Sequence, residues 1–148
     1  MPKLDLSAIE QVRKTGYPPP YDQAVADRLS RKIGEALGFE DFGITETTLL
    51  PGAWSSQRHW HEGEDELVIM LEGEAVLVEE GMRIAMRPGD IATFRKGVAN
   101  GHHLINESDR PCRFIAVGRV ATSDCHYPDT DMHLDGATGQ YVKKSAPD

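Results

Sequence analysis

The chain has 148 residues, and its 16 Lys and Arg against 24 Asp and Glu give a formal net charge of -8. Apolar residues make up 39% and charged residues 27%, which is too hydrophobic for a disordered chain and too polar for a membrane protein. A chain of this length favours one compact domain. The negative charge, without a dense Lys/Arg cluster, excludes nucleic acid and anionic membranes as primary partners.

Three features of the sequence favour a cytoplasmic location. The longest apolar run, 67–71, is far shorter than the roughly 20 residues that span a bilayer. The first residues carry no apolar signal-peptide region. The only two cysteines, Cys112 and Cys125, form no C-x-x-C motif, so we expect both to be reduced thiols.

Residues 1–41 are expected to form an extension ahead of the main domain. Three consecutive prolines at 18–20 predict an extended connector. Asp22 is a suitable N-cap for a helix over residues 23–37, and Gly38 is a suitable end for it. In this helix one face would carry Val25, Leu29, Ile33 and Leu37.

From residue 42 onward the hydrophobic period changes from helical to two. Short strand-like runs follow, and turn signals rich in Gly and Pro separate them: 42–49, 53–61, 66–71, 75–79, 82–86, 91–94, 102–106 and 113–117. Such a series without intervening helices predicts an antiparallel sandwich or barrel over residues 42–118. The polar residues 119–148 are expected to form an irregular tail wrapped on this barrel.

The histidines are clustered, and the first pair has the spacing of a metal site. Residues two apart on a strand share a face, so the imidazoles of His59 and His61 point the same way and Trp60 points the opposite way. The polar stretch 62–65 can turn the chain and bring Glu66 beside them. On its own, an H-x-H pair is also common on exposed strands without a ligand, and the acidic stretch is also typical of a solvated turn.

A second pair of histidines, His102 and His103, follows about forty residues later. Either one would supply a third imidazole if the sheet closes on itself. Three imidazoles and a carboxylate suit one divalent transition metal, with Fe, Mn, Ni, Co, Cu and Zn all open.

These residues also carry a resemblance to a known family. The residues Gly52, His59, His61, Glu66 and Gly73 resemble the first motif of the cupins, and the second motif is recognisable in Gly89, Gly97, His102 and Asn106. The resemblance covers about residues 42–118. It implies an all-β fold, the double-stranded β-helix or cupin jelly-roll barrel, with a metal held by His59, His61, Glu66 and His102. The flanking GYPPPYD and YPD segments are similar to those of small bacterial cupins loosely labelled sugar-phosphate isomerases.

The second motif departs from the cupin pattern near its histidine. Asn100 occupies the usual histidine position three residues after Gly97, so His102 follows a two-residue insertion. His102 shares strand parity with Asn106, as in cupins, and His103 is then expected to point out of the barrel or toward the tail. Asn100-Gly101 is a turn or bulge signal, and a bulge one residue later, beyond Gly101, would exchange the two faces, which keeps His103 as the alternative ligand.

Strand parity further predicts the lining of a partly apolar pocket. Its members by parity are Ser55, Gln57, Val68 and Met70. His103 and Asn106 are further candidates for the lining, from the segment of the fourth ligand. Arg58 is expected to point away from it. Few cations are expected to face inward, which argues against a phosphorylated substrate unless Arg113 does so.

A metal with open coordination positions can bind a substrate through two oxygens, or a substrate together with dioxygen. We therefore expect a metalloenzyme of dioxygenase, isomerase or decarboxylase type that acts on a small oxygenated molecule, without an assigned general acid or base. The alternative is a non-catalytic barrel that binds or senses a metal or small ligand. Exposed edge strands favour a homodimer.

Overall fold

The computed structural model describes residues 2–144. Its helical segments are short: the 3-10 helices η1 (Leu6–Ala8) and η2 (Gln23–Val25) and the helix α1 (Ile33–Leu37). The remaining elements are strands: β1 (Arg28–Lys32), β2 (Gly43–Leu49), β3 (Trp60–His61), β4 (Glu66–Glu72), β5 (Ala75–Glu79), β6 (Met82–Met86), β7 (Ile91–Phe94), β8 (His103–Ile105), β9 (Cys112–Gly118), β10 (Cys125–His126), β11 (Met132–Asp135) and β12 (Gln140–Lys143). The expected all-β architecture is confirmed.

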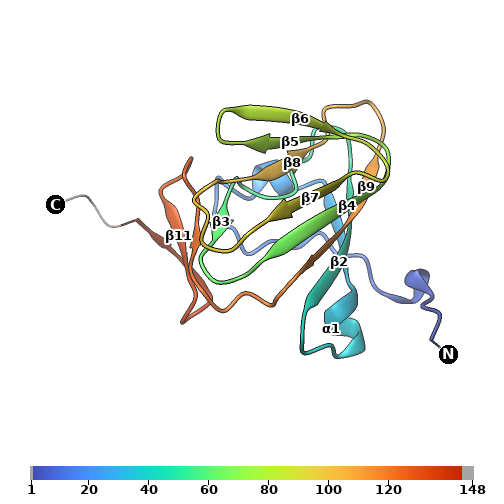
Figure 1. The fold of residues 1–148 in the computed structure, drawn as a ribbon, viewed down its shortest axis with the longest axis horizontal. Helices are drawn as coiled ribbons and strands as arrows, with labels where there is room; N and C mark the ends of the chain where they lie inside the picture. The colour runs from blue at the N-terminus through green and yellow to red at the C-terminus, as the bar shows by residue number, and fades with distance from the viewer. Residues whose placement is uncertain (1, 145–148) are drawn as a thin grey trace.

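The strands of the described chain form three antiparallel sheets (Figure 1). One has the order β1-β2-β9-β4-β7, a second has the order β6-β5-β8, and a third has the order β12-β11-β10-β3. The first two sheets share one core, to which β2 contributes Leu49, β4 contributes Met70, β5 contributes Leu77 and β9 contributes Phe114. Alternation along each strand sends these apolar side chains to the shared inner face.

The strand runs predicted between residues 66 and 118 are present, but the run 53–61 is a strand only at Trp60–His61. The partners of this segment change along its length. Trp54 makes an isolated bridge to Ile105, His59 makes one to His102, and β3 pairs with β10. Residues 102–106 run alongside residues 52–59, but Trp54 and His59 are five positions apart whereas Ile105 and His102 are only three apart, so the register shifts and a continuous ladder does not form.

The helix predicted over residues 23–37 is wrong for most of its length. Only α1 is α-helical, and Gly38 ends it in the left-handed conformation, as expected. The middle of the segment is β1, which pairs with β2 from Arg28 opposite Leu49 to Lys32 opposite Thr45. Five residues paired on a sheet edge outweigh the weak helix preference of a segment that contains Gly34.

The tail is more regular than expected. Residues 125–143 contain β10, β11 and β12, and β10 pairs with β3 so that Cys125 lies opposite His61 (Figure 1). A second apolar cluster, which includes Tyr17, Cys125 and Tyr127, joins the tail to the N-terminal segment. The last predicted tail residues, 145–148, lie outside the described part of the chain.

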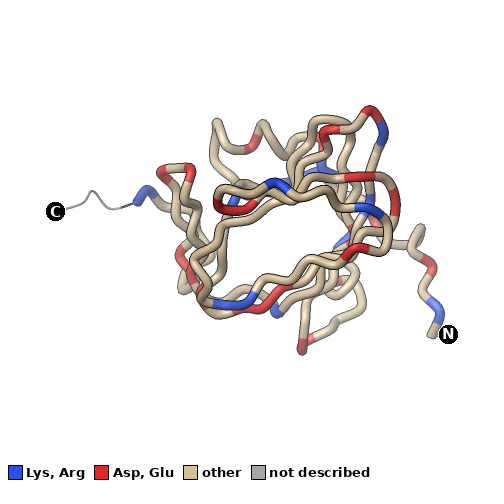
Figure 2. The backbone as a smooth tube through the Cα atoms, turned by 45° about the horizontal axis from the view of Figure 1, so that its top comes forward, with Lys and Arg blue, Asp and Glu red and all other residues tan. Residues whose placement is uncertain are grey.

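Charged residues are spread over the fold. Segments of Lys and Arg and segments of Asp and Glu are both scattered over the backbone (Figure 2). Within residues 2–144, the structure contains no helix with the length and apolar character needed to cross a membrane.

Candidate metal centre

Two residues that are close in sequence, His59 and Glu66, come together with the distant His102. His59 and His102 face each other through their isolated bridge, and Glu66 begins β4. One ligand atom from each of these three side chains lies within 4.8 Å of the others. The ring of Phe94, which lies opposite Glu66 in β7, stacks on His102 with centroids 3.5 Å apart. This packing fixes the plane of the His102 imidazole.

Backbone carbonyls orient both imidazoles in the form that binds a metal. His59 Nδ1 lies 2.8 Å from the Gln57 carbonyl oxygen, and His102 Nδ1 lies 3.1 Å from that of Asn100. A carbonyl only accepts, so each Nδ1 carries the hydrogen and each Nε2 keeps its lone pair. The Nε2 of His102 is buried without a hydrogen-bond partner. A buried acceptor of this kind is costly unless it has a ligand, so the site fits a metal ion.

His61 lies between two possible ligand sets. Its Nε2 is 3.6 Å from Glu66 Oε2, and its ring centroid is 5.0 Å from that of His59. Its Nδ1 is buried without a hydrogen-bond partner. A second group of nearby ligand atoms consists of His59, His61 and Cys125 of the tail. The sequence did not indicate Cys125 as a ligand, because only the pairing of β10 with β3 brings it there.

The electrostatics of the cluster favour neutral imidazoles at His59 and His102 beside an ionised Glu66. Burial lowers the pKa of His59, and it lowers that of His102 to about 4 with help from the neighbouring His59. Burial would raise the pKa of Glu66, but the adjacent His61 and the nearby His59 and His102 lower it overall. Burial would likewise lower the pKa of His61, but the neighbouring Cys125 and Glu66 raise it to about 10, so His61 has to release a proton before it binds a metal. Neutral His59 and His102 and ionised Glu66 are the forms that bind cations.

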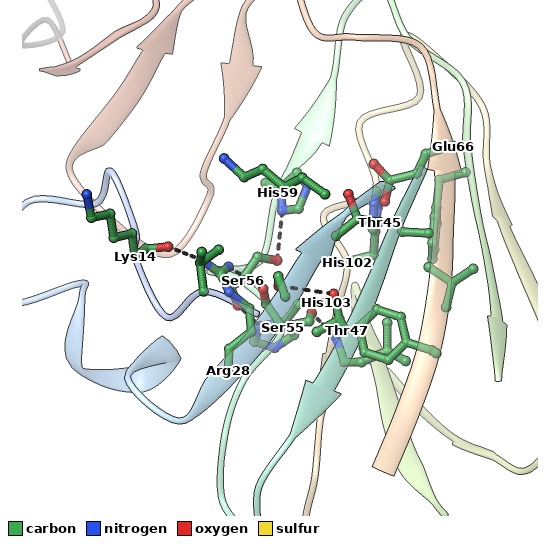
Figure 3. A pocket seen from close by; sticks show the side chains of 18 residues that line it. Lys14, Arg28, Thr45, Thr47, Ser55, Ser56, His59, Glu66, His102 and His103 are labelled. Atoms are coloured by element: carbon green, nitrogen blue, oxygen red, sulfur yellow. Dashed lines mark hydrogen bonds between the residues drawn. The ribbon is translucent and has the colours of Figure 1, made fainter. Parts of the chain in front are cut away.

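A cavity of about 260 Å³ opens beside the cluster (Figure 3). Its walls include His59, Glu66 and His102, together with Ser55 and Val68 from the predicted lining. Ser56 also lines it, and its hydroxyl lies 3.2 Å from His59 Nδ1. The cluster therefore faces a space of the size of a small molecule.

Three other predicted lining residues lie outside this cavity. The Gln57 amide donates to the Tyr21 carbonyl at 3.1 Å. Met70 is packed in the main core. Asn106 is fully buried and donates to the Leu49 carbonyl at 2.8 Å, so it organises a loop instead. Strand parity predicts the face on which a side chain lies but not the contacts that it makes there, and these three side chains are occupied elsewhere.

His103 also differs from the expectation that it points outward or toward the tail. It is buried and lines the same cavity as His102, with its ring 4.7 Å from that of Trp54. His102 pairs with His59, whereas His103, the first residue of β8, pairs with Val78 of β5. The two adjacent histidines therefore have different strands as partners. Simple alternation therefore does not separate them. Arg58, as expected, is not among the lining residues.

The expectation of few inward cations is also wrong. Lys14, Arg28 and Lys32 all line the cavity. Arg113 does not, because its guanidinium binds Glu72 on the other face of the sheet. Arg28 and Lys32 were missed because residues 28–32 were taken as helical, whereas strand alternation over them places both on one face.

Comparison with known proteins defines the class. The family described as "Cupin domain" matches residues 45–118, and the chain belongs to this family. The structure is similar to that of a sugar phosphate isomerase of the cupin superfamily from Silicibacter pomeroyi DSS-3, with 41% identity, a TM-score of 0.89, and coverage of 97% of this chain and 93% of that one. The expected cupin barrel is thereby confirmed.

Two further solved structures show the breadth of the fold. A protein of Acidithiobacillus ferrooxidans, proposed to be a sugar phosphate isomerase, has 27% identity and a TM-score of 0.71 over 78% of this chain and 74% of its own. The polyketide cyclase RemF from Streptomyces resistomycificus has 23% identity and a TM-score of 0.63 over 80% and 78%, which shows the fold alone. No curated protein sequence gives a significant match.

Proposed function

We propose that this cupin binds one divalent transition metal through His59, His61, Glu66 and His102 and acts as an enzyme on a small oxygenated molecule. The observation that carries the proposal is the buried Nε2 of His102, which has no partner and belongs to the same group of ligand atoms as His59 and Glu66. Three imidazoles and a carboxylate suit Fe, Mn, Ni, Co, Cu or Zn. When bound, such an ion supplies Lewis acidity to substrate oxygens, or redox chemistry if it is iron.

Two features of the cavity support an enzyme of isomerase, decarboxylase or dioxygenase type. The cavity, with a volume of about 260 Å³, lies directly beside the ligand cluster, so a substrate held there can reach the metal. His103 adds a candidate proton acceptor. Its Nδ1 lies 2.8 Å from the Ser56 carbonyl oxygen, so Nδ1 carries the hydrogen and Nε2 keeps a lone pair. The name of the Silicibacter pomeroyi relative favours an isomerase among these three types.

A second candidate is a non-catalytic barrel that binds or senses a metal or small ligand. The observation in its favour concerns Glu66, which is the sole carboxylate lining the described cavity. The proposed metal would bind this carboxylate, so the lining offers no second carboxylate for proton transfer. With metal-loaded protein, oxygen-uptake, isomerase and decarboxylase screens distinguish the two. Turnover that disappears when the metal is removed supports the enzyme. Tight ligand binding without turnover supports the binding protein.

The adjacent histidines provide a matched test of the proposed ligand set. We expect the purified protein to hold close to one transition-metal ion per chain by mass spectrometry of the elements. His102→Ala is expected to reduce metal affinity by about a hundredfold or more, because loss of a direct ligand should exceed loss of an outer partner. His103→Ala removes an equally buried imidazole from the same cavity and is expected to keep the metal. The reverse result would make His103 the ligand, and equal retention in both would contradict the proposed set.

A further inference from the structure

Arg28 is a cation of the cavity wall without an anionic partner. Its Nη1 donates to the Ser55 carbonyl at 2.7 Å, and its Nη2 lies 3.5 Å from the Lys14 carbonyl. No carboxylate within residues 2–144 forms an ion pair with it. A guanidinium has five N–H donors, so most of its hydrogen-bonding capacity is unused. Burial lowers the pKa of Arg28, which shows that its charge is partly desolvated.

Two lysines reinforce this positive region. Both line the cavity with exposed side chains: Lys14 forms no ion pair with the described residues, and Lys32 makes only a long 3.9 Å contact with the exposed Glu35. Against these three cations the cavity wall carries one carboxylate, Glu66, which the proposed metal would neutralise. This concentration of positive charge occurs in a chain whose net charge is -8. A partly buried cation without an anionic partner is unfavourable on its own, and a bound anion would offset this cost.

The positive region and the metal cluster are joined by two consecutive residues. The Ser55 carbonyl accepts from Arg28, and the Ser56 hydroxyl lies 3.2 Å from His59 Nδ1 (Figure 3). Figure 3 shows Arg28 and Glu66 on opposite sides of the same cavity. A single small molecule can therefore contact both regions, with uncharged hydroxyls of Thr45 and Thr47 also in the wall.

We propose that Arg28, with Lys14 and Lys32, binds a carboxylate or phosphate group at one end of the substrate. This inference rests on the proposed function, in which the other end of that substrate carries the oxygen atoms that approach the metal. The substrate class is then a small organic anion. A guanidinium binds either anionic group through paired hydrogen bonds, and its planar fork fixes the orientation of the bound molecule. Arg28 is thus a specificity-determining residue supplied by β1.

Calorimetric titration with three probes of similar size tests this subsite. Glycerol 3-phosphate and glycerate carry the two candidate anions, and glycerol carries neither. We expect at least one anion to bind and glycerol not to bind, with the stronger anion identifying the group. Arg28→Gln is expected to weaken that binding by about tenfold or more, because a charge-assisted hydrogen bond is lost. Binding is also expected to weaken as salt is added.

Two further variants keep the result interpretable. Arg13→Gln removes a cation from the same N-terminal segment, but Arg13 pairs with Asp27 on the surface and does not line the cavity, so binding is expected to stay unchanged. If Arg28→Gln does not fold, the double variant Lys14→Gln/Lys32→Gln replaces it and is expected to weaken binding several-fold. Anion binding unaffected by Arg28→Gln, or by the double variant used in its place, overturns the inference. So does equal binding of all three probes.

Metal content measured on the same samples separates this inference from the proposed function. Arg28→Gln is expected to keep its metal, because Arg28 is not in the ligand cluster. A protein that binds the anion through Arg28 but holds no metal supports the subsite and contradicts the metalloenzyme. A protein that holds metal but does not distinguish the anions from glycerol contradicts the subsite alone.

Discussion

Replacing His59 and His61 together with alanine is expected to abolish transition-metal binding. His59 belongs to both groups of ligand atoms, and His61 Nε2 lies 3.6 Å from Glu66 Oε2. The double variant leaves Glu66 and His102, and two ligands hold a first-row ion weakly. Metal affinity should fall by more than the roughly 100-fold that is typical when a residue outside the direct ligands is changed. Elemental analysis after dialysis, and the thermal shift on adding back metal, measure it.

The tail provides a matched control with the same number of imidazoles removed. His126 pairs with Glu62 at 2.6 Å, His133 pairs with Asp124 at 2.8 Å, and neither lines the cavity. His126→Ala/His133→Ala is expected to keep one metal per chain. Metal retained in His59→Ala/His61→Ala, or lost equally from both double variants, would show that the ion is held elsewhere.

A cysteine variant decides which of the two ligand groups is used. Cys125→Ala removes the thiol from the group with His59 and His61 but leaves Glu66 and His102 intact. We expect this variant to retain the metal, because the proposed set does not include Cys125. Loss of the metal from this variant alone would show that the group of His59, His61 and Cys125 holds the ion.

Arg58→Met is expected to destabilise the folded protein by about 2 kcal/mol, because several charge-assisted hydrogen bonds disappear together. The Arg58 side chain is only 10% exposed. It binds both Asp129 carboxylate oxygens at 2.8 Å, Glu80 at 2.8 Å and the Gly101 carbonyl at 3.1 Å. One side chain therefore ties the tail and the β5–β6 turn to the residue that precedes His102. Both carboxylates are more than half exposed and regain water when the arginine is removed, which limits the cost.

Thermal unfolding measures this effect, with a decrease in Tm of about 4–8 °C expected for a domain of this size. Arg83→Met is the control, because Arg83 pairs with Glu107 on the surface and such a pair contributes less than about 1 kcal/mol. We also expect Arg58→Met to weaken metal binding several-fold, through the altered position of Gly101. Equal Tm values for the two variants would contradict the role of Arg58.

The contribution of the Arg58 pair is also expected to depend on pH. The hydrogen bond from Arg58 lowers the pKa of Asp129 below its ordinary value. A carboxyl whose pKa is lower in the folded state stabilises the fold above its unfolded pKa, about 3.9. That stabilisation is lost as the pH falls through the lowered value. The Tm difference between wild type and Arg58→Met should therefore be full at neutral pH and shrink in acid.

The sequence by itself determined the barrel strands and the spacing of the proposed metal ligands. Period-two alternation and glycine-containing turns are local signals, and β5, β6 and β7 have the predicted bounds. His59 and Glu66 lie close in sequence across one turn, so their meeting follows from local geometry. His102 required the family pattern, because a partner about forty residues away leaves no local signal.

Only the tertiary structure decided which segments complete the cavity. β1 becomes a strand because β2 offers it an edge, and this pairing brings Arg28 and Lys32 into the wall. Cys125 reaches His61 because β10 pairs with β3. In both cases the deciding hydrogen bonds join residues far apart in the chain, and their energy outweighs local preferences that alone would favour a helix or an irregular tail.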